Sequence, residues 1–264
     1  IMKEKFNSFL CSNFFDRLPL FLKKKIRKIN NSYFCITDKN KLPTKNYTTK
    51  FSNNYQQFII NNFKSKNYIS KNSFNNLRKI LLNKKMKKIN LLDFGAGDIN
   101  TYLEIRNIKN LKYFYFDLPD RNKIIQKIIK KNKLHNIKII NNFNFTKKKF
   151  NFAFFGSSIG YSNNYENVLN KITNIKCNYI LFSGITFFQK NTNRDKHIVA
   201  KQLNIIPKIN FVFFFNKKIF INFFKKKNYV VKFCKKNQFK KISYKNLLFF
   251  SNKIEYCDIL FERK

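Results

Sequence analysis

A short apolar run that ends in a carboxylate and two glycines, residues 91–97 (LLDFGAG), constrains the fold more than any other part of the chain. Asp117 stands 20 positions after Gly97, at the end of a second apolar run. In a doubly wound α/β domain the first strand ends in a tight turn, where glycine lets the backbone approach a ligand. The second strand then brings a carboxylate to the ribose hydroxyls. The spacing therefore predicts a nucleotide-cofactor site in a domain of this kind.

From residue 89 onward, short apolar runs alternate with amphipathic segments. Strands are expected at residues 89–94, 111–117, 137–140, 150–156 and 178–182, and helices at 99–106, 121–133 and 165–175. This alternation indicates βαβ units around a mostly parallel sheet. A polar segment (189–196), an aromatic run (211–215) and a helix near 217–226 come next. Two terminal strands, near 229–233 and 256–261, are then expected to pair as an antiparallel hairpin.

Residues 1–88 contain no glycine and follow a different pattern. Apolar residues recur at helical spacing in 6–15, 18–29, 55–60 and 74–82, whereas the polar stretch 37–49, which contains Pro43, is typical of a loop. We therefore expect a small N-terminal helical cap (1–88) followed by an α/β domain (89–264). A poorly ordered tail with two helices is the alternative for the first part.

The formal net charge of +42 comes almost entirely from lysine. The lysines accompany many Asn, Ile and Phe residues and no Trp, a composition that AT-rich coding produces whatever the function. Arginine, which makes the better bidentate contacts with phosphates and bases, is not enriched. Nucleic-acid binding is therefore not favoured as the function, although non-specific affinity for polyanions is expected in vitro.

The five cysteines show neither a Cys-x-x-Cys motif nor Cys/His spacing, so neither a zinc site nor a disulfide framework is expected. No stretch reaches the roughly 18 apolar residues of a membrane span. The first residues lack the continuous apolar core of a secretion signal. These features predict a cytoplasmic protein without a membrane span.

Several nucleotide cofactors bind at glycine turns, and the residues around the turn distinguish between their binding motifs. The NAD fingerprint needs a third glycine where Asn100 stands. No Gly-Lys-Ser/Thr follows the turn, which excludes a P-loop. An S-adenosylmethionine (SAM) site needs only an open turn and an acid for the ribose. SAM is therefore the expected cofactor, and an NAD-dependent enzyme is the weakest alternative.

Residues 91–97 resemble motif I of class I SAM-dependent methyltransferases, and residues 115–118 (YFDL) resemble the acidic end of their second strand. Residues 152–161 (FAFFGSSIGY) look like the fourth strand and the loop on the catalytic face. Over roughly residues 50–264 the chain is similar to a family of little-characterised methyltransferases associated with bacterial surface-polysaccharide loci. The resemblance implies a Rossmann-like sheet with an antiparallel C-terminal hairpin, SAM as cofactor, and methyl transfer in polysaccharide biosynthesis.

The cofactor-binding residues follow from these motifs. Asp93 is expected to face the SAM amino group or to order the glycine turn; capping of the next helix is the alternative. Asp117 is expected to accept hydrogen bonds from the ribose hydroxyls, and Asn142 and Phe143 to hold adenine. The whole set is Asp93, Phe94, Gly95, Ala96, Gly97, Asp117, Leu118, Asn142, Phe143 and Gly156.

The methyl acceptor is expected beyond the fourth strand, near Ser157, Ser158 and Tyr161. The serines equally suit strand-end groups that satisfy the backbone. His197 follows the fifth strand and could deprotonate a sugar hydroxyl, because the unperturbed pKa of histidine lies near physiological pH; a solvent-exposed histidine is the alternative. The expected catalytic residues are His197, Ser157 and Tyr161. The Asn/Asp-Pro-Pro-Tyr/Phe and Pro-Cys signatures are absent, which disfavours DNA methylation.

The sequence therefore predicts a SAM-dependent methyltransferase acting on an oxygen or nitrogen of a small or sugar-linked acceptor. An RNA methyltransferase would use the lysine-rich N-terminal region as a substrate arm. A non-catalytic binding protein on a methyltransferase core is the third hypothesis. Residues 98–100 (Asp-Ile-Asn) support it, because they replace the small residues that commonly follow the second glycine.

Overall fold

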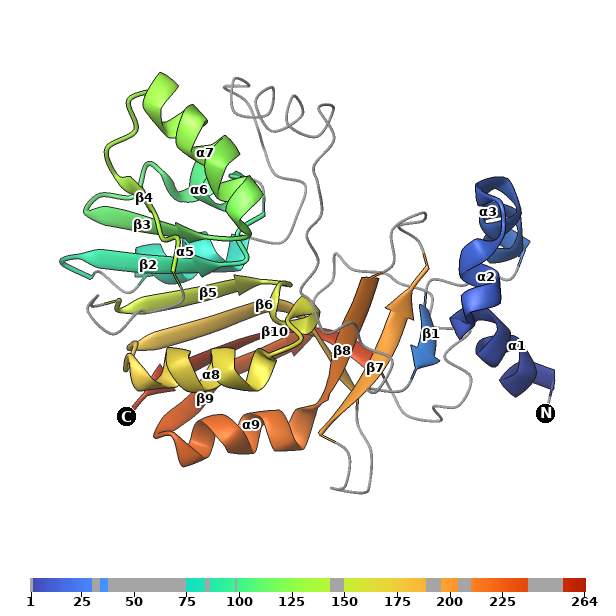
Figure 1. Cartoon of the computed structure of the whole chain (residues 1–264). Coiled ribbons are helices and arrows are strands. Elements are labelled where there is room, and N and C mark those ends of the chain that lie inside the picture. The colour runs from blue at the N-terminus through green and yellow to red at the C-terminus, as the bar shows by residue number, and fades with distance from the viewer. Residues whose placement is uncertain are drawn as a thin grey trace.

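The computed structural model describes residues 2–29, 34–37, 75–83, 86–97, 99–142, 150–188, 196–203, 210–236 and 254–264. Ten strands in these segments join one mixed sheet, and helices pack against it (Figure 1). Within the same segments, no helix combines the length and apolarity that crossing a membrane requires.

Five parallel strands form the centre of the sheet, in the spatial order β4-β3-β2-β5-β6. β10 pairs antiparallel with β6, and β9 pairs antiparallel with β10. The predicted mostly parallel sheet with a closing antiparallel pair is thus confirmed. The bounds are β2 (Ile89–Phe94), β3 (Leu111–Phe116), β4 (Ile137–Ile139), β5 (Phe152–Gly156), β6 (Tyr179–Phe188), β9 (Tyr229–Lys236) and β10 (Ile254–Arg263).

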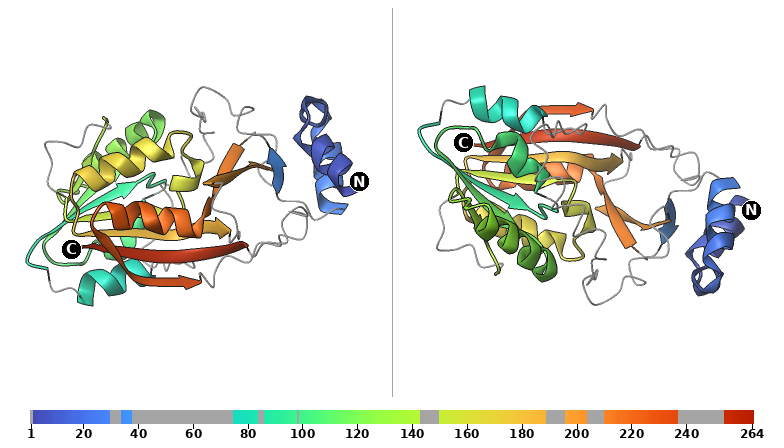
Figure 2. Two further views of the ribbon diagram at one scale, coloured as in Figure 1. Left: turned by 90° about the horizontal axis from the view of Figure 1, so that it is seen from below. Right: turned by 90° about the horizontal axis from the view of Figure 1, so that it is seen from above.

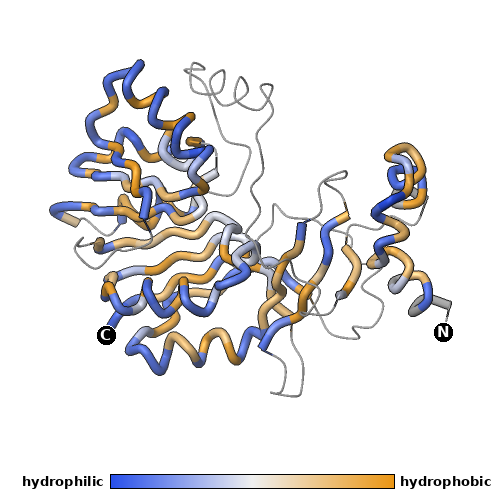
Figure 3. Tube along the Cα trace, in the orientation of Figure 1, coloured by the Kyte–Doolittle hydropathy of each residue, from blue (hydrophilic) through white to orange (hydrophobic). Residues whose placement is uncertain are grey.

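The central strands are buried on both faces, so their side chains divide between two apolar clusters. In β2, Leu92 and Phe94 join one cluster, while Ile89 and Leu91 join the other. Near-continuous apolar runs such as these are typical of parallel strands covered by helices on both sides. Figure 3 shows the same hydrophobic character along β5 and β6.

Each cluster has its own helices. α8 (Tyr165–Asn174) and α9 (Lys217–Lys226) contribute to the first cluster. α5 (Asn75–Asn83), α6 (Asn100–Ile105) and α7 (Pro119–Lys131) contribute to the second. Proline at the first position of α7 suits a helix start, where no N–H is needed. α5 belongs to residues 1–88, yet Leu77 and Leu81 lie in the core of the sheet domain. The division at residues 88 and 89 stays a prediction.

An antiparallel extension was not predicted from the sequence. It consists of β8 (Asn210–Asn216), β7 (His197–Gln202) and β1 (Phe34–Thr37). Among the described residues, β8 joins the main sheet where Phe187 and Phe188, at the end of β6, pair with Phe215 and Asn216. The extension lies between the main sheet and the helices α1 (Met2–Cys11), α2 (Asn13–Arg17) and α3 (Leu20–Ile29) in every view (Figures 1 and 2).

Most predicted elements match the structure to within a few residues. β6 continues six residues beyond the predicted end at 182 and reaches 188. Residue 37 lies in β1 rather than in the predicted loop. The helix predicted at 55–60 falls outside the described residues.

Candidate functional site

The turn after β2 is built from Gly95 and Gly97, which have φ angles of +64° and +67°. The amides of Gly95 and Ala96 both donate to the carbonyl of Phe116, at 2.8 and 3.2 Å, which ties the turn to the end of β3. A Cβ at position 95 would lie 2.4 Å from the Cβ of Ser158. Glycine is therefore required at 95 by its conformation and by the close approach of the loop after β5.

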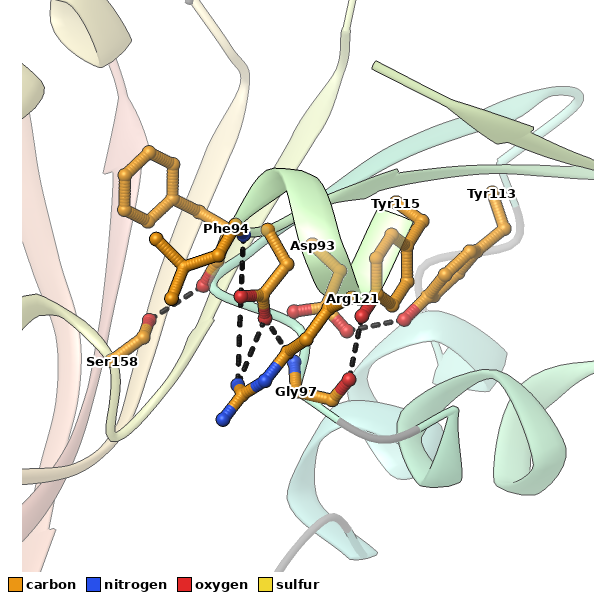
Figure 4. Close-up of polar contacts among 9 residues, drawn as sticks. Asp93, Phe94, Gly97, Tyr113, Tyr115, Arg121 and Ser158 are labelled. Carbon is orange, nitrogen blue, oxygen red and sulfur yellow. Dashed lines mark hydrogen bonds and ion pairs between the residues drawn. The ribbon is translucent and has the colours of Figure 1, made fainter. Parts of the chain in front are cut away.

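Asp117 connects the two strand ends at this site, where it contacts Gly97 and Arg121, both labelled in Figure 4. Its Oδ2 accepts a hydrogen bond from the Gly97 amide at 2.5 Å, and its Oδ1 accepts one from the Leu118 amide at 2.6 Å. Arg121, in the first turn of α7, pairs with Oδ2 at 3.2 Å. Only 4% of the Asp117 side chain is exposed, against 25% for Arg121. The carboxylate is thus fixed in place, with the partly exposed guanidinium of Arg121 beside it.

Two tyrosines of β3 support the turn from the interior. The Tyr115 hydroxyl donates to the carbonyl of Gly97 at 2.5 Å, and the Tyr113 hydroxyl donates to Oδ2 of Asp93. Burial raises the pKa of Tyr113 well above its usual value, and the neighbouring Asp93 carboxylate raises it further. Asp93 is fully buried. The printed contact of Asp93 is with Tyr113 of β3, and its role toward the cofactor or the glycine turn stays a prediction.

The remaining predicted cofactor residues surround the same strand ends. The ring of Phe94 stacks on Phe116 with centroids 5.0 Å apart, and Gly156, at the end of β5, pairs with Ser183 of β6. Asn142 is exposed beyond β4. Phe143, predicted to contact adenine, and Asp98 lie outside the described residues.

The two serines after β5 make main-chain contacts. Ser157 has a φ angle of +62°, and its hydroxyl donates to the carbonyl of Ser183 at 3.1 Å. The Ser158 hydroxyl donates to the carbonyl of Phe94 at 2.5 Å. Both hydroxyls donate to main-chain carbonyls, as expected for strand-end groups that satisfy the backbone, the alternative that the sequence left open for the serines.

A short 3₁₀ helix, η2 (Ile159–Tyr161), brings this loop to the antiparallel extension. A Cβ at Gly160 would lie 3.2 Å from the carbonyl oxygen of Phe213 in β8. Tyr161 is 41% exposed, and the side chain of Gln202, at the end of β7, lies close enough to its hydroxyl to lower the pKa that burial raises. The loop after β5, which is predicted to face the acceptor, therefore contacts the antiparallel extension.

His197 begins β7, and its surroundings are more enclosed than the sequence indicated. Its Nδ1 lies 2.7 Å from the hydroxyl of Tyr165 at the start of α8, and its ring packs edge-on against Phe213, with centroids 4.9 Å apart. The Tyr165 hydroxyl also donates to Glu166 Oε1 at 3.2 Å. Burial, and then the Glu166 charge, raise the pKa of Tyr165, so the phenol stays protonated at physiological pH.

Sequence reasoning missed Tyr113, Tyr115, Arg121 and Tyr165. A signal was present for Arg121, because it stands four residues after Asp117 at the start of a helix, where ion pairs form. The tyrosines resembled ordinary strand and helix residues. Among the described residues, no three or more His, Cys, Asp or Glu side chains gather in a way that could hold a metal ion.

Comparison with known proteins gave matches in structure only. No protein-family model matches the chain, and no curated protein matches it. The 1,6-didemethyltoxoflavin-N1-methyltransferase of Burkholderia thailandensis, solved with 1,6-didemethyltoxoflavin and S-adenosylhomocysteine (SAH), matches with a TM-score of 0.51 and 10% identity, over 88% of this chain and 95% of that chain.

Two further structures match at a TM-score of 0.50. One is a SAM-dependent methyltransferase from Clostridium acetobutylicum, with 11% identity over 80% of this chain and 99% of that chain. The other is the N-terminal domain of EvdMO1 with SAH bound, with 9% identity over 71% of this chain and 79% of that chain. The chain has the Rossmann-like fold of SAM-dependent methyltransferases. At these identities the likeness establishes the fold, and the activity has to be argued from the site.

Proposed function

We propose that the protein is a SAM-dependent methyltransferase. The observation that carries this proposal is the Asp117 carboxylate, held by the amides of Gly97 and Leu118 where β2 and β3 end side by side. In open α/β sheets, ligands bind at the carboxyl ends of the strands, and an acid at the second strand recognises ribose. Together with the fold, this arrangement favours a nucleoside cofactor at the turn.

The residues present fit such a cofactor. A carboxylate offers about four acceptor positions, and the two main-chain amides use only two of them. Arg121 occupies a further position, but its side chain is partly exposed and can withdraw when ribose hydroxyls donate to Asp117. Among the described residues, a Cβ added at Gly97 would meet the Arg121 guanidinium, 3.6 Å away, at an ordinary van der Waals distance. The turn therefore leaves room on the side where Arg121 lies.

Bound SAM would supply an electrophilic methyl group, and the protein would align the acceptor with it. Asp117 and Gly97 would hold the ribose and the adjoining chain of the cofactor. His197 would take a proton from a hydroxyl acceptor, with Tyr165 fixing the orientation of its ring through Nδ1. Tyr161 and Gln202 would contact the acceptor from the exposed side of the loop after β5.

For the acceptor, the proposal is an oxygen or nitrogen of a small or sugar-linked molecule in the cytoplasm. Its support is the resemblance of residues 50–264 to methyltransferases associated with surface-polysaccharide loci, and the absence of base-modifying signatures. The partly exposed Tyr161 suits this class, because an aromatic face with a hydroxyl beside an amide can both pack on and hydrogen-bond a sugar ring.

Calorimetric titration of the purified protein with SAH, with NAD in parallel, tests the cofactor. Micromolar binding of SAH alone supports the proposal and leads to acceptor screening with nucleotide-sugars and glycans. Binding of NAD alone, or of neither ligand, contradicts it, and the second outcome favours the binding-protein hypothesis. Methyl transfer from labelled SAM to RNA but to no glycan would support the RNA methyltransferase instead.

A further inference from the structure

The corner between α2 and α3 exposes an unusual concentration of large apolar side chains. Among the described residues, five large hydrophobic side chains are exposed, and three of them, Phe14, Leu20 and Phe21, lie within eight consecutive positions. Phe14 is 65% exposed, Leu20 40% and Phe21 68%. AT-rich coding raises the number of phenylalanines along the whole chain, but it gives no reason for exposed phenylalanines to occur close together. We define Phe14, Leu20 and Phe21 as the corner patch.

The corner patch is held by well-packed neighbours. Phe15, the residue after Phe14, is only 1% exposed and joins a small core with Leu10 and Leu203. Lys201 of β7 is almost fully buried and reaches across to Asp16, with Nζ and Oδ1 2.6 Å apart. Phe14 therefore points outward while Phe15 points into the core. The backbone that carries Phe14 is held in place by the burial of Phe15 and by the ion pair between Asp16 and Lys201.

The charge around the patch is positive. Lys24 and Lys25 of α3 and Arg17 of α2 are exposed, and Lys23 is half-buried with its Nζ on the carbonyl of Asp16. Residues 2–29 contain eight basic and two acidic residues, and one of the acidic residues, Asp16, is paired with Lys201. Figure 3 shows hydrophobic and hydrophilic segments alternating along these helices.

We propose that the corner patch docks the protein onto an anionic lipid bilayer. Exposed aromatic and aliphatic side chains beside lysines are the composition of interfacial helices, in which the rings enter the boundary between headgroups and acyl chains. Anionic headgroups attract each nearby lysine or arginine. A nucleic acid would be attracted by the charge alone, but it gives no reason for exposed phenylalanine and leucine. This inference is independent of the proposed methyl transfer.

The chain contains no tryptophan, so a single introduced tryptophan reports on its own surroundings. Phe21→Trp places a single fluorophore in the corner patch. We expect its emission to shift to shorter wavelength with vesicles of phosphatidylcholine and phosphatidylglycerol, and not with phosphatidylcholine alone. The matched control is Leu82→Trp in α5, where Leu82 is 54% exposed outside the patch; its emission is expected to stay unchanged.

Vesicle sedimentation provides the second measurement. Phe14→Ser and Phe21→Ser should each lower the partition constant by about tenfold, because each removes an apolar side chain that enters the bilayer. Leu82→Ser should leave it unchanged. Unchanged melting temperatures are expected for all three variants, since the side chains are exposed. About 0.5 M salt should weaken binding by screening.

Three results would overturn the proposal. The first is binding to anionic vesicles that is unchanged when Phe14→Ser and Phe21→Ser are combined. That result would show that charge alone, and not the apolar side chains, causes the binding. The second is RNA binding by the wild-type protein with no vesicle binding. The third is a wild-type protein that does not bind vesicles but forms a concentration-dependent dimer, which the double substitution abolishes. That result would assign the corner patch to contact with a second copy of this chain.

Discussion

The Ser158 hydroxyl donates a 2.5 Å hydrogen bond to the carbonyl of Phe94, so the loop after β5 is fastened to the end of β2. The Cβ of Ser158 also fills the space that a side chain at position 95 would need. The turn that we propose binds the cofactor and the loop that we propose faces the acceptor therefore form one unit. A change in one is expected to displace the other.

Gly95→Ala should lower the free energy of unfolding by about 3 kcal/mol, because a left-handed φ and an overlap with Ser158 act together. Ser158→Gly alone should cost about 1 kcal/mol, the value of one lost hydrogen bond. Urea denaturation of both variants and of the double variant measures the coupling. We expect the double variant to recover part of the loss; strict additivity would show that the overlap is not the cause.

Gly97→Ala is the matched control for that experiment. Residue 97 has a similar φ of +67°, but the added Cβ would come no nearer than 3.6 Å to Arg121 Nη1. The expected cost is about 1–2 kcal/mol from backbone conformation alone. A loss as large as that of Gly95→Ala would contradict the packing argument.

Asp117→Ala should weaken SAH binding by about 1.5–3 kcal/mol, since charge-assisted hydrogen bonds to the ribose are lost. Arg121→Ala should act in the other direction. It removes a partly exposed ion pair that binding has to displace, and such pairs contribute about 0–1 kcal/mol, so SAH should bind up to about fivefold more tightly. Calorimetry on both variants measures these shifts.

Unchanged SAH affinity in Asp117→Ala would mean that the cofactor site is misplaced. A large loss of affinity in Arg121→Ala would mean that the guanidinium contacts the ligand rather than competing with it. Either result can be separated from misfolding by comparing the melting temperatures of the free variants.

His197→Ala should lower turnover of a hydroxyl acceptor by about 100-fold or more, the usual contribution of a general base. SAH affinity should not change. Tyr165→Phe should produce a smaller loss, because it removes the 2.7 Å contact that orients the imidazole and leaves the base present. His135, the only other histidine, is exposed before β4, so His135→Ala is the control. Full activity in His197→Ala would remove this residue as the base.

The central fold was predictable because its sequence signals are local. Buried parallel strands are continuous apolar runs, and the helices between them carry apolar residues at helical spacing, as Ile124, Ile125 and Ile128 do in α7. The glycine turn and Asp117 were found because a fixed spacing links them. The contact between Gly97 and Asp117 then follows from the parallel pairing of β2 with β3.

The antiparallel extension was not predictable for a physical reason. β7 contains His197, Lys201 and Gln202 among its six residues, and the buried Lys201 finds its partners, Asp16 and the carbonyl of Leu10, on helices far away in the sequence. β1 is four residues long and pairs with a strand more than 150 positions away. Tertiary partners rather than local propensity create these strands. The same applies to Tyr165, whose role depends on His197 being brought beside it.

Asp16→Asn should destabilise the protein by about 3 kcal/mol, because it leaves the buried Lys201 ammonium without a counter-charge. The control is Asp120→Asn, whose partner Lys123 lies 3.9 Å away on the surface of α7. This exposed pair should contribute less than about 0.5 kcal/mol. Equal melting temperatures for the two variants would show that the ion pair between α2 and β7 contributes no more than a surface pair.

Cys234 should be the most reactive of the three cysteines Cys177, Cys234 and Cys257. A hydrogen bond from Cys257 and the charge of Lys217 lower the pKa of Cys234 to about 7, whereas burial raises that of Cys177 to about 12. The thiolate is the reactive form, so alkylation of Cys234 by iodoacetamide should rise through pH 7 and level off above it. Peptide mass spectrometry follows each cysteine separately. Lys217→Met should raise the pH at which alkylation is half-maximal, while Lys218→Met, at the exposed neighbouring position, should leave it unchanged. A half-maximal pH near 8.5 in the wild-type protein would contradict the lowered pKa of Cys234.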